Sequence, residues 1–378
     1  MKMKNIIITV AALTVGVAAN ANEAVVPVSA MAGPIEVRVD PNFELIGMVC
    51  HLAGYAEYGM SGNREEREAV RERFGSYTNH PTVKAFAEYR KKFYVGYDAP
   101  ASLSVHLKPD LSGYFTSLDP WPERLDGRWK KADLEKIRRQ LVEFRDASRF
   151  GEWYVSRTGI YSARIRDTIK QLGGLRLPEW LSRYYGPQKY KSRLRVVVTK
   201  LPDGHNFGVS VQVSDDEVLY SPVISCNTLI YVLPHEFSHP FTDAPGKRIL
   251  RELEAKCPDA FAGFKKEFGN VKDLMARQAY GSIPIWWGES FNRANEMRYF
   301  RSCLPKYEDR SEKYRIITYT DMVEYLLEGY EKKRGFALVR PLYNLLDKYE
   351  ADREKYKTLD DFVPVVVDFL VERYPKVR

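Results

Sequence analysis

The sequence predicts an α+β fold that is mostly helical, with a small antiparallel sheet, and three observations lead to this prediction. Long stretches before residue 190 and after residue 246 carry apolar residues at helical spacing. Between them, residues 191–225 are rich in β-branched residues and turn residues. The segment 231–243 then reads YVLPHEFSHPFTD. We therefore expect helices, a small sheet, a helix that carries this motif, and further helices.

The first residues predict a secretory signal peptide. Lys2 and Lys4 precede a largely apolar run from Ile6 to Ala18, and the small-residue sequence ANA ends at Ala21. This order is typical of a signal peptide that is cleaved after Ala21. The apolar run is 13 residues long, which is short for a membrane-spanning helix. Residues 1–21 are thus predicted to be removed, leaving a periplasmic or extracellular protein without a membrane anchor.

The next two segments are predicted to be a loose lead-in and a helical region. Residues 22–35 are rich in Ala, Val and Pro and are expected to form the lead-in. Residues 36–190 are predicted to be a helical N-terminal region. Within it, Asp133 is the expected N-cap of a helix. Four apolar residues at helical spacing follow it and are expected to face the core: Leu134, Ile137, Leu141 and Phe144.

The region 191–378 is predicted to form the second part of the chain and to begin with three short strands. They are expected at 194–200, at 207–214 and at 217–225, where β-branched residues gather. Strand 207–213 is expected to lie at an edge, where it can pair with an extended substrate. After residue 246 the pattern is helical to the end. A helix near the C-terminus is predicted to begin at the capping box Thr358-x-x-Asp361.

Charge and cysteine content narrow the classes of partner. The formal net charge is +8, and loss of residues 1–21, with two lysines and no acid, leaves +6. The basic residues alternate with acids, which indicates solvated helix faces, so no nucleic-acid partner is expected. The four cysteines form no C-x-x-C pair, so a cysteine zinc site is not predicted. Two interpretations of the cysteines remain open, up to two disulfides or buried free thiols. The residues are Cys50, Cys226, Cys257 and Cys303.

The sequence HEFSH carries the strongest chemical signal. On a helix, His235 and His239 lie one turn apart on the same face and can hold one metal ion. Glu236 lies next to that face and is the expected general base for a bound water. The alternative is two histidines that are hydrogen-bonded at a helix surface. Pro240 cannot donate to the carbonyl of Glu236, so the helix is expected to bend or end there, and Pro234 is expected at its first position.

A third ligand is needed, and a carboxylate is expected because no histidine follows His239. The sequence after His239 excludes the metzincin continuation, which needs another histidine. Asp243 is too close along a chain that Pro240 is expected to bend. Glu252 and Glu254 belong to a charged segment that indicates a surface helix.

The better candidates lie in IWWGESFNRANEMRYF, residues 285–300. Its tryptophans and other apolar residues predict a buried helix. Glu289, Arg293 and Glu296 share one face of it, since they are four and seven residues apart. We favour Glu289 over Glu296 as the ligand, and both remain open. Arg293 is expected to orient the carboxylates.

HEFSH followed some fifty residues later by a helical glutamate resembles the gluzincin class of zinc metallopeptidases, in the thermolysin-like clan. The chain is more closely similar to a family of exported bacterial domains of unknown function in that clan, over residues 36–378. The similarity is carried by residues 39–58, 80–90, HEFSHPF, 289–298 and 335–364. It implies one zinc ion at His235, His239 and Glu289, with Glu236 as base. Clan membership implies a zincin-like catalytic region over residues 191–378 and peptide hydrolysis.

The resulting expectation is an exported zinc metallopeptidase that acts on a peptide or protein. The alternative is a non-catalytic exported protein that binds a peptide or another ligand on the same scaffold. The intact HEFSH sequence favours the enzyme. Pro234, Pro240 and Arg293, which stands where an aspartate is familiar in the clan, favour the alternative. A tyrosine or histidine usually holds the oxyanion in such enzymes; with 25 tyrosines the choice stays open, and His205 reads more readily as a turn residue.

Overall fold

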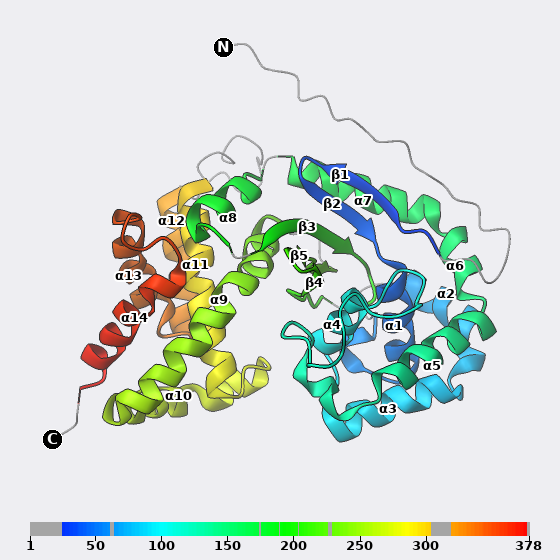
Figure 1. Ribbon diagram of the computed structural model, residues 1–378, viewed down its shortest axis with the longest axis horizontal. Coiled ribbons are helices and arrows are strands. Elements are labelled where there is room, and N and C mark those ends of the chain that lie inside the picture. Colours follow the sequence, from blue (N-terminus) through cyan, green and yellow to red (C-terminus); the bar gives the residue numbers. More distant parts are fainter. Residues whose placement is uncertain are drawn as a thin grey trace, which may run out of the picture. The chain divides into compact units, whose positions relative to one another are not determined.

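A computed structural model of the chain shows a mostly helical α+β fold with a small mixed sheet (Figure 1). It describes residues 25–60, 64–173, 175–188, 190–202, 204–225, 229–303 and 319–375. The α+β fold class predicted from the sequence is therefore confirmed. The predicted signal peptide, its cleavage site at Ala21 and Cys226 lie outside the described residues.

The chain divides into two compact units. Unit 1 comprises Met1–Gly173 and Lys189–Glu236, and unit 2 comprises Gly174–Gln188 and Phe237–Arg378. These units are not the segments 36–190 and 191–378 expected from the sequence. The reason is a strand pairing: β2 (Ile35–Val39) pairs in parallel with β3 (Lys191–Val198), so the strand region joins the N-terminal helices.

The sheet of unit 1 has six strands in the order β1-β2-β3-β5-β4, with β6 also paired to β3. The remaining strands are β1 (Val28–Ala32), β4 (Ser210–Ser214), β5 (Glu217–Tyr220) and β6 (Val223–Ile224). The outer pairs β1·β2 and β4·β5 are antiparallel, whereas β3 runs parallel to β2, β5 and β6. The expectation of a purely antiparallel sheet is thus wrong. The predicted edge position of β4 agrees with this order.

The expectation of a loose lead-in over residues 22–35 does not hold for residues 28–35. Val28–Ala32 forms β1, which turns back into β2 as an antiparallel pair. Gly33 lies in the turn with φ of 58°, a conformation that costs glycine little. Side chains of β1 are only part-buried, whereas most of β2 is buried. The weak apolar alternation of an outer strand explains why its composition resembles that of a loop.

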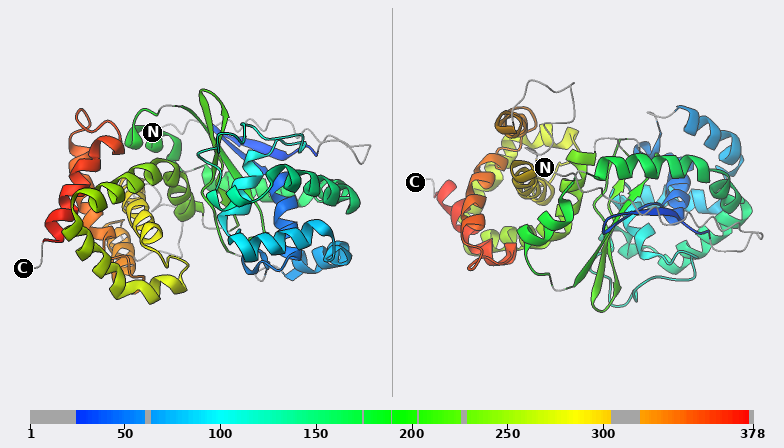
Figure 2. Two further views of the ribbon diagram at one scale, coloured as in Figure 1. Left: turned by 60° about the horizontal axis from the view of Figure 1, so that its bottom comes forward. Right: turned by 90° about the horizontal axis from the view of Figure 1, so that it is seen from above.

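The α-helices of unit 1 precede β3 in the chain. They are α1 (Pro41–Leu52), α2 (Arg64–Phe74), α3 (Pro81–Phe93), α4 (Asp98–His106), α5 (Leu134–Ala147), α6 (Phe150–Ser156) and α7 (Thr158–Leu172). α7 runs along the sheet and contacts β1, β2 and β3 (Figures 1 and 2). In α5 the predicted apolar stripe is buried, and the Asp133 carboxylate accepts from the Lys136 N–H, so both expectations for this helix are confirmed.

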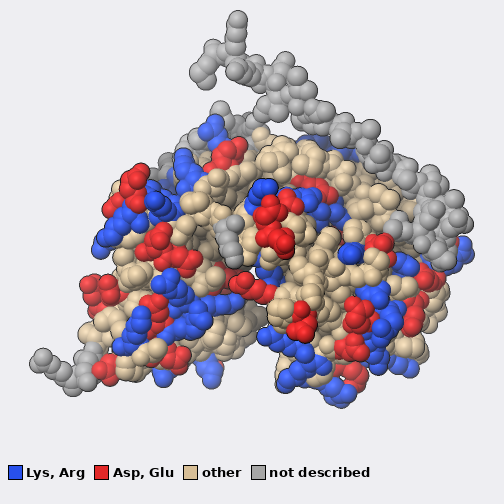
Figure 3. Space-filling model, viewed as in Figure 1, with Lys and Arg blue, Asp and Glu red and all other residues tan. Residues whose placement is uncertain are grey.

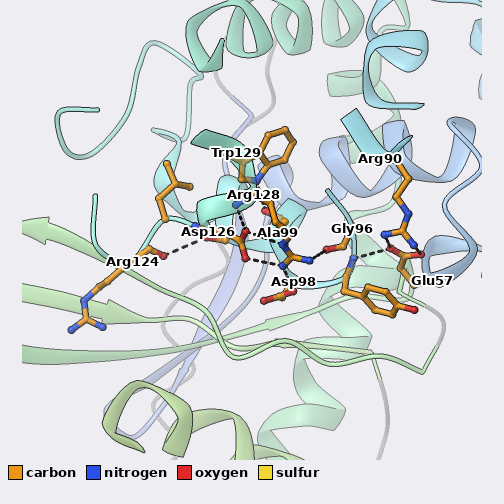
Figure 4. Close-up of polar contacts among 12 residues, drawn as sticks. Glu57, Arg90, Gly96, Asp98, Ala99, Arg124, Asp126, Arg128 and Trp129 are labelled. Carbon is orange, nitrogen blue, oxygen red and sulfur yellow. Dashed lines mark hydrogen bonds and ion pairs between the residues drawn. The ribbon is translucent and has the colours of Figure 1, made fainter. Parts of the chain in front are cut away.

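A buried ion pair fixes the turn before α4. Glu57 accepts the Tyr97 N–H at 2.7 Å and pairs with Arg90 at 2.8 Å (Figure 4). Arg128 donates to the Gly96 carbonyl at 2.9 Å. Tyr97 has φ of 54° and ψ of −114°, which non-glycine residues rarely adopt. The surrounding bonds on both sides of Tyr97 hold the backbone in this strained conformation.

Most of unit 2 is helical. Its elements are α8 (Leu177–Tyr185), α10 (Pro258–Arg277), α11 (Ile283–Cys303), α12 (Tyr319–Glu328), the π-helix η6 (Gly329–Lys333), α13 (Val339–Ala351) and α14 (Leu359–Arg373). The capping box of Thr358 and Asp361 is present at the start of α14, as predicted.

The motif helix α9 spans Leu229–Lys256 and does not end at Pro240. Pro234 is likewise not its first residue. A proline in a helix removes one backbone hydrogen bond and costs about 3 kcal/mol. Burial of Leu233, Phe237 and Ile249 on this helix offsets that cost, since all three apolar side chains are 0% exposed. The expected break is therefore overridden by packing.

The cysteines that the structure describes are unpaired. Cys50, Cys257 and Cys303 are free thiols, and burial raises the pKa of the Cys50 thiol well above its ordinary value. Within the described residues, no helix is both long and apolar enough to cross a membrane. On the face shown in Figure 3, basic and acidic residues are interspersed. This face therefore has no large patch of a single charge sign.

Candidate metal centre

Helices α9 and α11 carry the residues that the sequence singled out (Figure 1). His235 and Glu236 on α9 are each 8% exposed. His239, one turn later, and Glu289 on α11 are part-buried. Continuous helical geometry through Pro240 keeps His235 and His239 on one face of α9, as their spacing predicted.

His235, His239 and Glu289 come together. One ligand atom of each lies within 4.8 Å of those of the other two, so the group could hold a metal ion. His239 Nε2 lies 3.5 Å from Glu289 Oε1. Two ligands that are each about 2.0–2.1 Å from a tetrahedral ion lie roughly 3.4 Å apart, so this pair has suitable spacing. Glu296 is not part of the group.

A carboxylate on the same helix orients His239. Asp243 Oδ1 lies 3.2 Å from His239 Nδ1. An Nδ1–H donated to Asp243 leaves the Nε2 lone pair directed towards Glu289, and such second carboxylates are typical supports of metal-binding histidines. Asp243 was not expected in this position, because a break at Pro240 would have turned it away, whereas α9 continues through Pro240. The i, i+4 spacing on an unbroken helix was the signal that could have identified its role.

Arg293 orients Glu289 in the same way. Its Nη2 donates to Glu289 Oε2 at 3.0 Å, which leaves Oε1 facing His239. The guanidinium also donates to the hydroxyls of Tyr280, at 3.1 Å, and Tyr330, at 3.3 Å. Phe336 lies beneath it, with the guanidinium carbon 5.1 Å from the ring centroid. Arg293 is buried and lies beside the carboxylate, as its position on the helix predicted. Tyr280 and Tyr330 carried no sequence signal that would place them here.

The second candidate acid is in a different environment. Glu296 is buried, and this burial raises its pKa to about 7, although Arg293 acts in the opposite direction. The nearest oxygen of Glu296 is 3.9 Å from Arg293 Nη1. A carboxyl that keeps its proton near neutral pH is a poorer metal ligand than an ionised one. The geometry therefore separates Glu296 from Glu289, and burial disfavours the ionised form of Glu296.

Two hydrogen bonds connect the site helices. Thr242 Oγ1 on α9 donates to Asn292 Oδ1 on α11 at 2.8 Å. Trp287 Nε1 on α11 donates to the Gly246 carbonyl on α9 at 2.8 Å. Both bonds are buried, so they fix the register in which Glu289 faces His239. Neither pairing was predicted, because each joins residues some forty to fifty positions apart.

His205 lies elsewhere in its own unit. Its ring packs edge-on against Tyr97, with centroids 5.7 Å apart, and is stacked with Phe207 at 6.5 Å. Both neighbours belong to unit 1, like His205 itself. The aromatic packing accounts for this histidine as a residue of a loop in unit 1.

The donor set consists of atoms that proteins use to bind divalent metal ions. Two imidazole nitrogens and one carboxylate oxygen are a set that zinc hydrolases use, with a fourth position left for water. Each of His239 and Glu289 has one atom engaged by a supporting residue and the other directed to the shared point. The side chains present could therefore hold one metal ion.

Comparison with known proteins identifies a family for this chain. A comparison with curated proteins and a comparison with solved structures gave no match. One family, described as a domain of unknown function (DUF4932), matches residues 35–369. This range includes both site helices and nearly all of the two units. The chain therefore belongs to the DUF4932 family.

Proposed function

We propose that this protein is an exported zinc metallopeptidase in which His235, His239 and Glu289 bind the zinc ion. The observation that carries the proposal is the convergence of these three side chains on one point. Asp243 and Arg293 support it, because each orients one of the three. The resemblance to the gluzincin class adds the expectation of peptide hydrolysis.

Zinc in such a site lowers the pKa of a bound water to near neutrality and polarises a substrate carbonyl. Glu236 follows His235 on α9 and is buried. We assign it the role of general base, which takes a proton from the attacking water. Arg293 neutralises one oxygen of Glu289 and keeps the other in place.

A non-catalytic binding protein is the second candidate, and the Glu289–Arg293 ion pair favours it. That pair, at 3.0 Å, stabilises the carboxylate without any ion. A scaffold that has lost its metal could therefore keep this arrangement. Export is part of both proposals, and it predicts a mature chain that begins at Asn22. The intact mass of secreted protein tests it, since retention of Met1 would contradict it.

The experiment that separates the two functions uses Glu236→Gln. Zinc content and hydrolysis of a broad peptide library are measured for the wild type, with and without a chelator, and for the variant. The glutamine keeps the shape of Glu236 but cannot accept the proton. We expect full zinc content and a loss of rate of about 10²–10⁴-fold. If the zinc-loaded wild type cleaves no peptide, the binding-protein proposal replaces the enzyme. Equal cleavage by Glu236→Gln would remove Glu236 from the mechanism.

A further inference from the structure

Unit 1 contains a cleft that the proposed peptidase does not use. Its volume is about 300 Å³, which is at the lower end of the range for small-molecule sites. One wall is formed by α7, through Arg164, Thr168 and Gln171. The other is formed by the residues at the ends of β3 and β6, including Thr199 and Ser225.

The position of this cleft in the sheet is significant. β3 runs parallel to β2 and to β6, so the carboxyl ends of all three strands lie at one edge. Ligands of sheets with parallel strands bind outside the carboxyl ends of those strands. The chain that leaves β2 continues into α1, whose first turn carries Glu44. The chain segments that follow β2, β3 and β6 therefore bring polar groups to the same edge of the sheet.

Arg164 is the group that points to a ligand. It lines the cleft and is part-buried. Its guanidinium lies near the Tyr161 ring, 5.8 Å from the centroid. In the part of the chain that the structure describes, the guanidinium of Arg164 makes no hydrogen bond and no ion pair within 4 Å. A planar guanidinium with unused N–H groups in a cleft is suited to hold a carboxylate by two parallel hydrogen bonds.

The other charges of the cleft favour an anion with a single charge. Lys200 adds a second cation to the lining, and Asp167 is the acid among the lining residues. The Asp167 carboxylate lies 3.6 Å from Lys170 Nζ. Asp167 lies on the same face of α7 as Arg164, three residues later. Its negative charge repels a bound anion, and it repels a dianion such as phosphate more strongly than a monoanion.

The buried acid beside the cleft does not oppose an anion. Glu44 Oε1 accepts from Thr199 Oγ1 at 2.6 Å. Burial raises the pKa of Glu44 to about 7, while Arg164 acts in the opposite direction. Below that pH the carboxyl is largely neutral. An anion held by Arg164 therefore meets little repulsion from it.

We propose that this cleft binds a small ligand that carries one carboxylate, and that Arg164 holds the carboxylate. The site belongs to unit 1 alone. It does not depend on the proposed metal centre, because its lining includes none of the metal-centre residues.

The test is a titration of the purified full chain with N-acetylglycine, followed by calorimetry and ligand-observed NMR. Zinc is first removed with a chelator, so that carboxylate binding to the metal does not contribute. We expect saturable binding with a dissociation constant of about 1 mM or below. N-acetylglycinamide has the same size without the charge and is expected to bind at least about tenfold more weakly.

Variants of α7 locate the binding. Arg164→Gln is expected to weaken N-acetylglycine binding by roughly 10- to 100-fold, because a charged hydrogen-bond pair is lost. Arg164→Lys keeps the positive charge but cannot donate two parallel hydrogen bonds, so its affinity for N-acetylglycine should lie between those of the wild type and Arg164→Gln. Arg166→Gln is the matched control, since Arg166 is exposed on the same helix and does not line the cleft. Circular dichroism and thermal unfolding check that each variant is folded.

Three results would overturn the proposal. The first is no binding of N-acetylglycine to the wild type at roughly 10 mM. The second is equal affinity in Arg164→Gln and the wild type. The third is tighter binding of inorganic phosphate than of N-acetylglycine, which would exclude the assignment to a carboxylate. If Arg164→Gln does not fold, the Arg164→Lys titration and the N-acetylglycinamide comparison still decide the result.

Discussion

Two of the candidate metal ligands are each oriented by a polar side chain four residues later on the same helix. His239 is held by Asp243 and Glu289 by Arg293. In both cases one atom of the ligand is occupied, and the other is directed to the shared point. Such supports raise metal affinity because they remove rotamer freedom before the ion arrives and fix the protonation state of the ligand.

Removal of the Asp243 carboxylate is expected to weaken metal binding without removing a ligand. Asp243→Ala should lower zinc affinity by about 10–100-fold, because the Nδ1 proton of His239 loses its acceptor. Competition with a chromophoric chelator measures the affinity. Glu254→Ala is the control, since Glu254 is exposed on the same helix. Wild-type affinity in Asp243→Ala would show that this carboxylate does not support the site.

The choice of the third ligand has its own test. Glu289→Ala should lose more affinity than any supporting residue, that is, more than about 100-fold. Glu296→Gln keeps the shape of a buried side chain and should bind zinc as the wild type does. The same chelator competition compares the two variants. Loss of zinc in Glu296→Gln, with binding kept in Glu289→Ala, would reverse the assignment.

At the scale of elements, the register of α9 against α11 decides whether the ligands meet. Two side-chain bonds set this register, and both are buried. The sequence predicted both helices and the face that carries Glu289, because these follow from local spacing. It did not predict the pairing of Thr242 with Asn292. Local spacing also failed at Pro240, where burial of the helix outweighs the lost backbone bond.

A double-mutant cycle on Thr242 and Asn292 tests the register. Thr242→Val leaves a buried amide oxygen without this donor and is expected to cost about 1–3 kcal/mol. Asn292→Leu alone should destabilise similarly. The double variant should cost less than the sum of the single variants, since neither polar partner remains. Denaturant unfolding gives the free energies. Strict additivity of the two changes would mean that this bond contributes nothing to the stability of the pair.

At the scale of the whole molecule, the chain is arranged by strand pairings that no local pattern contains. Residues 35–39 pair with a strand more than 150 residues later, as the contact of Glu36 with Arg195 shows. This pairing places the strand region in unit 1 and makes the sheet mixed. Strand positions within 191–225 were predictable from β-branched residues. Their order and direction were not, because adjacent strands in the sequence suggest hairpins.

The parallel edge also creates the buried acid Glu44, and its titration should be visible in the stability of the chain. Glu44 is 4% exposed, on the first turn of α1. Around it lie Arg164 on α7, Thr199 after β3, and the pair of Glu66 and Arg157. Burial is the largest influence, and it raises the Glu44 pKa to about 7.

A folded-state pKa above the unfolded value means that the folded chain binds the proton more tightly. The contribution of Glu44 to stability is then fully present below its ordinary pKa and is lost as the pH rises through about 7. His106, whose pKa is lowered to about 4 by burial, acts in the opposite direction, and Glu296 acts in the same direction.

A comparison of the wild type with Glu44→Gln isolates Glu44. The difference between their unfolding free energies does not contain the contributions of His106 and Glu296, because these are the same in both proteins. One pKa unit is worth about 1.4 kcal/mol, so this difference should fall by about 3 kcal/mol from pH 4.5 to pH 7.5. Urea unfolding at a series of pH values measures it. A difference that stays constant or grows with pH would show that Glu44 is not held in its protonated form by burial.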